Sequence, residues 1–425
     1  MPLSTDEHIG TRVQIARNAA GLTQVELADF LARSESWVAN VESGRQPLDR
    51  YSVITAIADR CDVDVVWLLG QPYRLQRSGG NLAHAHIPAL RTGLRRAGLI
   101  LSGHPGLSPQ GGPVDLAAMR EKTRQASVAR QAANLPKVAT LLPPLVEDLN
   151  TAVLTTDGVE REEALHLLAD AARTARMCLN QLGYPDLAWS AAEVAAGAAT
   201  ALDDPVVKAA VAWDRCGALL HQASLRETIA VADAALRDLE PHATGRGRDQ
   251  AAVSLRGALH LRCSIAHARG GQGDDAWARI DAALQDADQL GPEWYDLERH
   301  TVFGRGTVAV HAAEAGVEVD QPDAGLKKVP RVDISEIPSK ERRTHFRIDE
   351  ARAAPDGAEL VGRGQAPGGC GRRAVLRVRR PDEPGSRVRP RACGRPVPGR
   401  IPVRPHPEHG TREVTPLLLR TVDAP

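Results

Sequence analysis

Three polar side chains that can bond to the edges of nucleic-acid bases lie close together near the N-terminus. They are Glu35, Ser36 and Asn40. Val38 and Val41 in the same segment have the spacing of an inward helical face, so the three polar residues face outward. An amide can bond an adenine edge, a carboxylate can accept from a cytosine amine, and a hydroxyl suits either kind of base. The segment therefore has residue types that can read a DNA sequence.

Two short helices separated by a turn must position these side chains. Thr23 and Glu26 have the spacing of a capping box, which predicts that one helix starts at Thr23. Ser34 is a suitable cap for the next helix, and Ala32–Arg33 forms the turn between them. In a helix-turn-helix the first part of the second helix enters the major groove.

Three residues in this segment have alternative roles. Gln24 is in the first turn of the first helix, where free backbone N–H groups favour a phosphate. Trp37 either contacts a thymine methyl or sugar, or covers the apolar seam between helices. Glu35 either accepts from a base or only complements the helix dipole.

Around this pair of helices, residues 6–70 are predicted to form five short helices. At Leu22-Thr23-Gln24, Glu26-Leu27-Ala28 and Glu42-Ser43-Gly44, and in the ending DVDVVWLLG, the sequence resembles the Cro and phage-repressor (Xre-like) helix-turn-helix family. The resemblance implies that Gln24, Ser43 and Arg45 touch phosphates and that Glu35, Ser36 and Asn40 face bases. It also implies a buried structural pair between Arg17 and Glu42. The full expected DNA-binding set is Thr23, Gln24, Ser34, Glu35, Ser36, Trp37, Asn40, Ser43 and Arg45.

This sequence departs from the family in two ways. Ala32 stands where the family usually has glycine, and a positive φ there costs roughly 1 kcal/mol. Residues 1–75 also carry 7 Arg against 10 Asp and Glu, so general attraction to phosphate is weak. Affinity then depends on dimerisation and on a few arginines, for which the candidates are Arg12, Arg33, Arg45 and Arg50.

From about residue 114 to 314 the sequence predicts one helix after another. Three segments, DLAWSAAEVAAGAATALDDP, SLRETIAVADAALRDLEP and DDAWARIDAALQDADQLGP, are similar to one another and start about 40 to 50 residues apart. This spacing is near the length of a helical-hairpin repeat. The sequence thus predicts an all-α chain: a five-helix helix-turn-helix domain followed by an α-solenoid.

The helical region also resembles the tetratricopeptide-like C-terminal halves of multidomain regulators from high-GC bacteria. The likeness is carried by LLPPLVEDL (141–149), DLAWSAAEVA (186–195), VFGRGTVAVH (302–311) and IPSKERRTHFRIDEARA (337–353). It implies a superhelical groove for a peptide, a small molecule or another subunit. Five histidines either line this groove or are ordinary surface or core residues: His221, His260, His267, His300 and His311.

The last part of the chain differs in character. Residues 354–425 contain 14 Arg, no Lys, 10 Gly and 12 Pro, without apolar periodicity. Such a segment cannot bury enough surface to fold. We expect either a genuine disordered basic tail or the product of a reading-frame shift near Ala353. The expected division is residues 1–75 (helix-turn-helix), 76–113 (a helix and flexible linker), 114–353 (helical repeats) and 354–425 (tail).

Composition limits the remaining functions. The chain has 53 basic and 53 acidic residues, and its six cysteines form no CxxC pair, so we expect neither a metal nor a disulfide framework. We find no nucleotide-binding or hydrolase motif, and therefore expect no catalytic residue and no cofactor. The N-terminus does not resemble a signal peptide, and no apolar run is long enough to span a membrane.

These observations favour a cytoplasmic bacterial transcription regulator that binds double-stranded DNA as a homodimer and responds to a peptide or small-molecule effector. Two alternatives stay open: a helical-repeat scaffold whose N-terminal module binds protein, and an antitoxin-type repressor.

Overall fold

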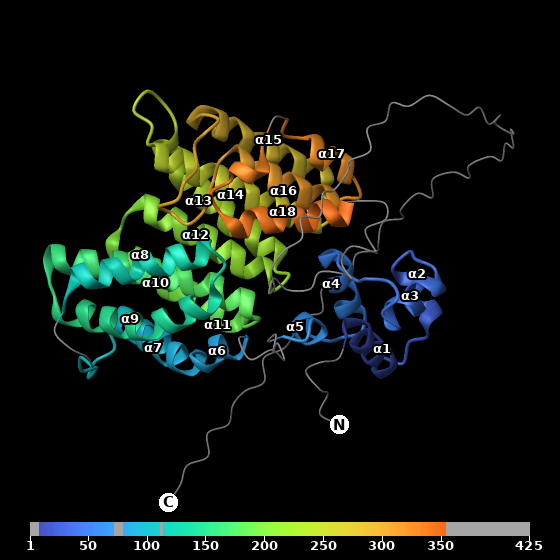
Figure 1. Ribbon diagram of the computed structural model, residues 1–425, viewed down its shortest axis with the longest axis horizontal. Coiled ribbons are helices and arrows are strands. Elements are labelled where there is room, and N and C mark those ends of the chain that lie inside the picture. The colour runs from blue at the N-terminus through green and yellow to red at the C-terminus, as the bar shows by residue number, and fades with distance from the viewer. Residues whose placement is uncertain (1–7, 72–79, 111–113, 331, 354–425) are drawn as a thin grey trace, which may run out of the picture. The chain divides into compact units, whose positions relative to one another are not determined.

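The computed structural model describes residues 8–71, 80–110, 114–330 and 332–353 (Figure 1). These residues form α-helices and one short 3-10 helix, and no strand occurs among them. The prediction of an all-α fold with a helix-turn-helix at the N-terminus and helical repeats after it is confirmed. The predictions made for residues 354–425 lie outside the described part.

Five short helices form the N-terminal region, as predicted. They are α1 (Ile9–Ala19), α2 (Gln24–Phe30), α3 (Glu35–Glu42), α4 (Tyr51–Arg60) and α5 (Val65–Leu68). Thr23 and Glu26 form a reciprocal capping box at α2, and the Ser34 side chain caps α3. The inward side chains of all five helices meet in one core, which includes Val13, Ala16, Leu27, Val38, Val41, Ile54, Ile57 and Leu68.

Thirteen further helices follow in the described residues. They are α6 (Gly80–Ala85), α7 (Ile87–Leu101), α8 (Leu116–Gln131), α9 (Leu135–Thr155), α10 (Gly158–Leu182), α11 (Pro185–Leu202), α12 (Pro205–Leu220), α13 (Leu225–Ala243), α14 (Gln250–Arg269), α15 (Gly273–Leu290), α16 (Arg305–Glu318), α17 (Pro322–Lys327) and α18 (Lys340–Ala353). The 3-10 helix η1 (Ile334–Glu336) precedes α18.

Antiparallel helical hairpins are the repeating unit of this region. Helices α10 and α11, α12 and α13, and α14 and α15 pack against each other (Figure 1). The three similar segments found in the sequence form the second helix of each hairpin, α11, α13 and α15. The first helices form a continuous row, because α10 packs on α12, α12 on α14, α14 on α16 and α16 on α18. The predicted repeat is therefore a stack of two layers.

Small side chains allow the hairpins to pack closely. On α11, Ala188, Ala191, Ala195 and Ala198 are fully buried. Gly257 on α14 lies against the ring of Phe303, and a Cβ at this glycine would come within 2.0 Å of the ring. Alanine favours the helix and glycine permits the close approach, so the low aromatic content of the chain is compatible with a dense core.

A buried ion cluster joins two helices of the first-helix row. Asp214 on α12 is fully buried, and its Oδ2 accepts from Nε of Arg173 at 2.5 Å while its Oδ1 accepts from Nε of Arg176 at 3.0 Å. Burial alone would raise the pKa of Asp214, but the two guanidinium groups on α10 hold it below its usual value. The cluster fixes α12 against α10.

The segment between the two regions is more closely packed than the sequence suggested. Helix α7 packs against α9 and α11, and its apolar face belongs to the core of the helical region. In the stretch expected to be a flexible linker, Leu107 packs on the same core and the carbonyl of Gln110 accepts from Thr151 at 2.8 Å. The sequence signal of glycine and proline correctly indicated a non-helical segment but gave no information on these contacts.

Two further features of the fold concern the cysteines and the length of the apolar helices. Cys61, Cys178, Cys216 and Cys263 are free and buried, as expected of small core residues. No helix within the described ranges is long and apolar enough to cross a membrane.

Candidate nucleic-acid interface

The local sequence fixes where α3 begins. Ser34 is extended, with φ −84° and ψ 153°, and its Oγ accepts from the backbone N–H of Trp37 at 3.2 Å. Ala32 in the preceding turn has a φ of 52°, which is a left-handed conformation. A glycine, the usual residue at this position in the family that the sequence resembles, would adopt it without strain. The turn and the cap therefore set the direction in which the first turn of α3 presents its side chains.

The outward edge of α3 carries free hydrogen-bonding groups. Glu35 and Ser36 are exposed and Asn40 is partly buried, whereas Val38 and Val41 are buried beneath them. The carboxylate of Glu35 and the side-chain amide of Asn40 make no hydrogen bond with any residue that the structure describes. The Oγ atoms of Ser34 and Ser36 lie 3.0 Å apart. This edge can exchange hydrogen bonds with a ligand without breaking bonds inside the protein.

Trp37 has a different environment. Its ring is partly buried and packs against the core of the N-terminal region. The guanidinium of Arg33 lies 5.8 Å from the ring centroid. These contacts suit the interpretation in which Trp37 covers the seam between the helices, and its contact with DNA stays a prediction.

Arg17, Gln24 and Glu42 form one buried network behind α3. Nε of Arg17 donates to Oε1 of Glu42 at 2.5 Å, and Nε2 of Gln24 donates to Oε2 of the same carboxylate at 2.7 Å. Nη1 of Arg17 donates to the carbonyl of Leu22 at 2.7 Å. The structure thus brings together α1, α2 and the end of α3. Gln24 is expected at a phosphate, but its side-chain Nε2 is engaged inside the protein.

The other expected contact residues lie at the ends of α2 and α3. Thr23 is exposed, but its hydroxyl and backbone N–H are engaged by Glu26. Ser43 and Arg45 are exposed beyond the C-terminus of α3, and Nε of Arg45 donates to Oγ of Ser43 at 3.0 Å. The guanidinium of Arg45 keeps its other N–H groups for an external anion.

Two of the four arginines expected to support affinity are not available. Arg12 is buried, with 7% of its surface exposed, and its guanidinium packs against Gly70. Arg50 donates to the carboxylate of Asp320 and to the carbonyl of Val317. That expectation was wrong for both residues, because sequence spacing does not show which arginines have partners distant in the chain.

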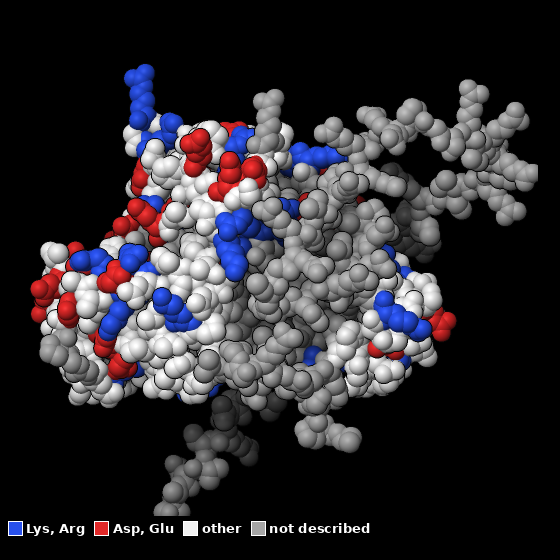
Figure 2. Space-filling view, in the orientation of Figure 1, with Lys and Arg blue, Asp and Glu red and all other residues white. Residues whose placement is uncertain are grey.

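Charges of both signs are mixed on the surface shown in Figure 2, including the part around α2 and α3. The N-terminal region has no uniformly basic face in this view. This mixture agrees with the net acidic count of residues 1–75.

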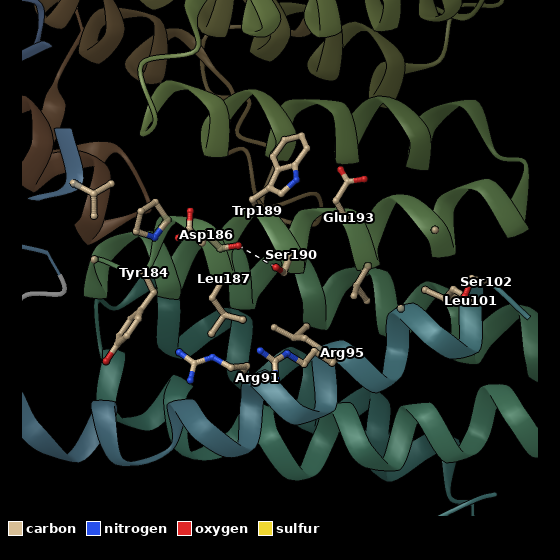
Figure 3. Close-up of a pocket in the computed structure, with 17 residues that line it drawn as sticks. Arg91, Arg95, Leu101, Ser102, Tyr184, Asp186, Leu187, Trp189, Ser190 and Glu193 are labelled. Atoms are coloured by element: carbon tan, nitrogen blue, oxygen red, sulfur yellow. Dashed lines mark hydrogen bonds between the residues drawn. The ribbon is translucent and has the colours of Figure 1, made fainter. Parts of the chain in front are cut away.

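The helical region contains pockets that the sequence analysis did not identify. The larger, of about 920 Å³, is lined mainly by α7, which carries Arg91 and Arg95, and by α11 with Tyr184 at its start and Trp189 and Glu193 along it (Figure 3). A second pocket, of about 510 Å³, is lined by α12, α14, α16 and α18. Of the five histidines considered for a groove, His221 and His311 line this second pocket. The sequence signal that could have indicated both pockets is the presence of arginines within otherwise apolar helical segments.

One comparison with known proteins agrees with the N-terminal assignment. Residues 8–66 match a family model described as a helix-turn-helix domain, which confirms that part of the predicted resemblance. No curated protein matches the chain. Among solved structures the chain is similar to Bacillus thuringiensis PlcR in complex with the peptide PapR7 and DNA, with 15% identity and a TM-score of 0.34, over 67% of this chain and 95% of that chain.

Proposed function

We propose that this protein is a sequence-specific DNA-binding transcription regulator of Xre type, with a tetratricopeptide-like region that senses a peptide or a small molecule. Residues 1–75 would be the DNA-binding domain and residues 114–353 the sensing domain, joined by residues 76–113. The regulator would act in a bacterial cytoplasm as a homodimer on a two-fold DNA site, because two copies of one short helix double the number of base contacts.

The observation that carries this proposal is the outward edge of α3. Glu35 and Asn40 have no hydrogen-bonding partner among the described residues, although both sit on a helix braced from behind by the Arg17–Glu42 pair. Unpartnered polar groups on a rigid helix can bond base edges in the major groove at little cost. Ser43 and Arg45, at the end of the same helix, would contact the phosphate backbone and fix its register.

The charge of the N-terminal region adds a specific expectation. With 7 Arg against 10 acidic residues in residues 1–75, and with Arg12 and Arg50 engaged, few cations are left to neutralise phosphates. Binding should therefore be weak on random DNA and should depend only modestly on salt concentration. Recognition would rest on base contacts and dimerisation more than on general attraction.

Selection of bound sequences from random duplex DNA tests the proposal. The full chain is incubated with the library, bound DNA is recovered over several rounds, and enriched sequences are compared with scrambled versions in a gel-shift titration. We expect a two-fold symmetric motif with half-sites one helical turn apart. Enrichment of no motif would reject the regulator and favour the alternative of a helical scaffold whose N-terminal module binds protein.

A further inference from the structure

The pocket lined by α12, α14, α16 and α18 contains the guanidinium of Arg262, which has no carboxylate partner among the described residues. The other charged side chains that line this pocket are those of Arg269, Arg342, Glu314 and Asp349. The volume of the pocket is about 510 Å³, within the range of sites for small organic ligands. Arg262 on α14 lines it, together with the apolar side chains of Leu220, Ile265 and Ile348. A cation and an apolar wall thus share one cavity of ligand size.

Arg262 has no hydrogen bond or ion pair with any residue that the structure describes. Its guanidinium stacks on the ring of Trp213, 4.2 Å from the centroid, which leaves the N–H edges free. Its Nε is buried without an acceptor. Charged groups withdrawn from water are normally paired, so an unpaired guanidinium facing a cavity is unusual.

Neighbouring arginines increase the positive charge. Arg176 and Arg342 also approach Trp213, with distances of 5.5 and 6.0 Å to the ring centroid. Withdrawal from water and the repulsion of these two neighbours lower the pKa of Arg262 to about 9, so the group is still charged at neutral pH. Arg176 is bonded to Asp214, while Nε of Arg342 is buried without an acceptor. Of these three guanidinium groups, only that of Arg262 makes no hydrogen bond with any described residue.

Gly217 on α12 provides the space for this arrangement. A Cβ at this position would lie 2.8 Å from Nη1 of Arg176 and 3.2 Å from Nη2 of Arg262. Any larger residue would displace both guanidinium groups. The glycine at this position therefore leaves room for the two guanidinium groups beside α12.

We infer that this pocket binds a small organic anion, with a carboxylate or phosphate on the guanidinium of Arg262 and an apolar portion against Leu220, Ile265 and Ile348. The planar fork of a guanidinium matches both kinds of oxyanion. The ligand would supply the acceptor that the guanidinium of Arg262 lacks in a partly desolvated site. Its role as an effector rests on the proposed function, but its binding does not.

The test therefore measures binding in the absence of DNA. The thermal midpoint of the full chain is followed while N-acetyl-leucine, its neutral amide N-acetyl-leucinamide, or inorganic phosphate is added at constant ionic strength. We expect the carboxylate, the phosphate or both to raise the midpoint, and the neutral amide to have no effect. Stabilisation by only one of the two anions identifies the oxyanion that the site prefers, and stabilisation by neither overturns the proposal.

Variants locate the site. Arg262→Met should raise the apparent Kd for the anion by at least about tenfold, Arg262→Lys should do so by less, and Gly217→Ala should also weaken binding. Arg237→Met, which removes an exposed arginine from α13, should bind like the wild type. Without ligand, Arg262→Met should melt at the wild-type temperature or higher, since it removes an unpaired charge. Equal anion stabilisation of wild type, Arg262→Met and Arg262→Lys would overturn the proposal.

Discussion

The guanidinium of Arg17 and the carboxylate of Glu42 form a two-bond pair 25 residues apart in sequence, with Nε–Oε1 and Nη2–Oε2 distances of 2.5 and 3.1 Å. Only 9% and 3% of the two side chains are exposed. The pair joins α1 to the end of α3. The orientation of the helix that carries Ser36 and Asn40 therefore depends on a contact hidden behind it.

Removal of one partner of this pair should be costly. Glu42→Ala leaves the Arg17 guanidinium buried without a counter-charge and removes the acceptor of Gln24, so we expect a loss of about 3–5 kcal/mol in the stability of the N-terminal region. Hydrogen exchange of the backbone amides of α1–α3 in the full chain measures this loss directly.

The matched control for this prediction is Glu26→Ala, which removes an exposed carboxylate of the capping box and should cost much less than Glu42→Ala. The double variant Arg17→Met with Glu42→Leu should recover most of the loss, because an apolar pair of similar volume leaves no buried charge. Similar exchange rates in Glu42→Ala and Glu26→Ala would contradict a buried structural role.

Base reading by α3 predicts a loss that depends on DNA sequence. Ser36→Ala and Asn40→Ala should each weaken binding to the selected motif by about 1–3 kcal/mol while leaving binding to scrambled DNA unchanged. Ser43→Ala should instead weaken both, since its expected contact is with phosphate. Gel-shift titrations on the two DNAs separate these cases, and a uniform loss in all three variants would rule out base reading.

The turn before α3 predicts a gain in stability. Ala32 has a φ of 52°, so Ala32→Gly should stabilise the N-terminal region by roughly 0.5–1 kcal/mol. Ala20 ends α1 with a φ of −76°, and Ala20→Gly should give no gain. Hydrogen exchange of the α2 and α3 amides provides the comparison. If both glycines had the same effect, backbone strain at Ala32 would not be the cause.

Local signals in the sequence predicted much of the N-terminal fold. The caps Thr23 and Ser34 and the apolar spacing of Val38 and Val41 act over three or four residues, so they can be recognised without a structure. The engagement of Arg50 by Asp320 could not be predicted in this way, since 270 residues separate the two. Whether an arginine is free is decided by tertiary packing.

The helical region shows the same limit. Segment similarity predicted α11, α13 and α15, because each must satisfy the same packing requirement in one layer. The pocket of Arg262 depends instead on a glycine on α12 and on arginines from α10 and α18. The periodicity of the sequence does not show which side chains from different helices meet in one pocket.

The ion cluster at Asp214 predicts a large loss of stability in the helical region when this residue is replaced. Asp214→Asn keeps the shape of the side chain but leaves the guanidinium groups of Arg173 and Arg176 buried without their shared carboxylate. We expect a loss of about 3–5 kcal/mol. Asp170→Asn is the control, since this carboxylate, 3.2 Å from Arg173, is partly exposed and its removal should cost about 1 kcal/mol or less. Urea unfolding of the full chain measures both, and losses of equal size would refute the special role of Asp214.

Buried His311 predicts how stability changes with acid. It is 4% exposed, and burial together with the charge of Arg342 lowers its pKa to about 3, from 6.5 in the unfolded chain. Near pH 7 the ring is neutral in the folded protein and mostly neutral in the unfolded chain, so it contributes little to the pH dependence there. As the pH falls below 6.5 the unfolded chain gains a proton that the folded chain cannot accept, so stability is lost progressively down to about pH 3. Between pH 7 and pH 5 this one group should account for a loss of about 2 kcal/mol in the free energy of unfolding.

The variant His311→Gln should show a correspondingly smaller loss of stability in urea unfolding over that interval. His104→Gln removes an exposed histidine and should keep the wild-type loss. An unchanged pH dependence in His311→Gln would mean that His311 takes up a proton in the folded protein as readily as in the unfolded chain.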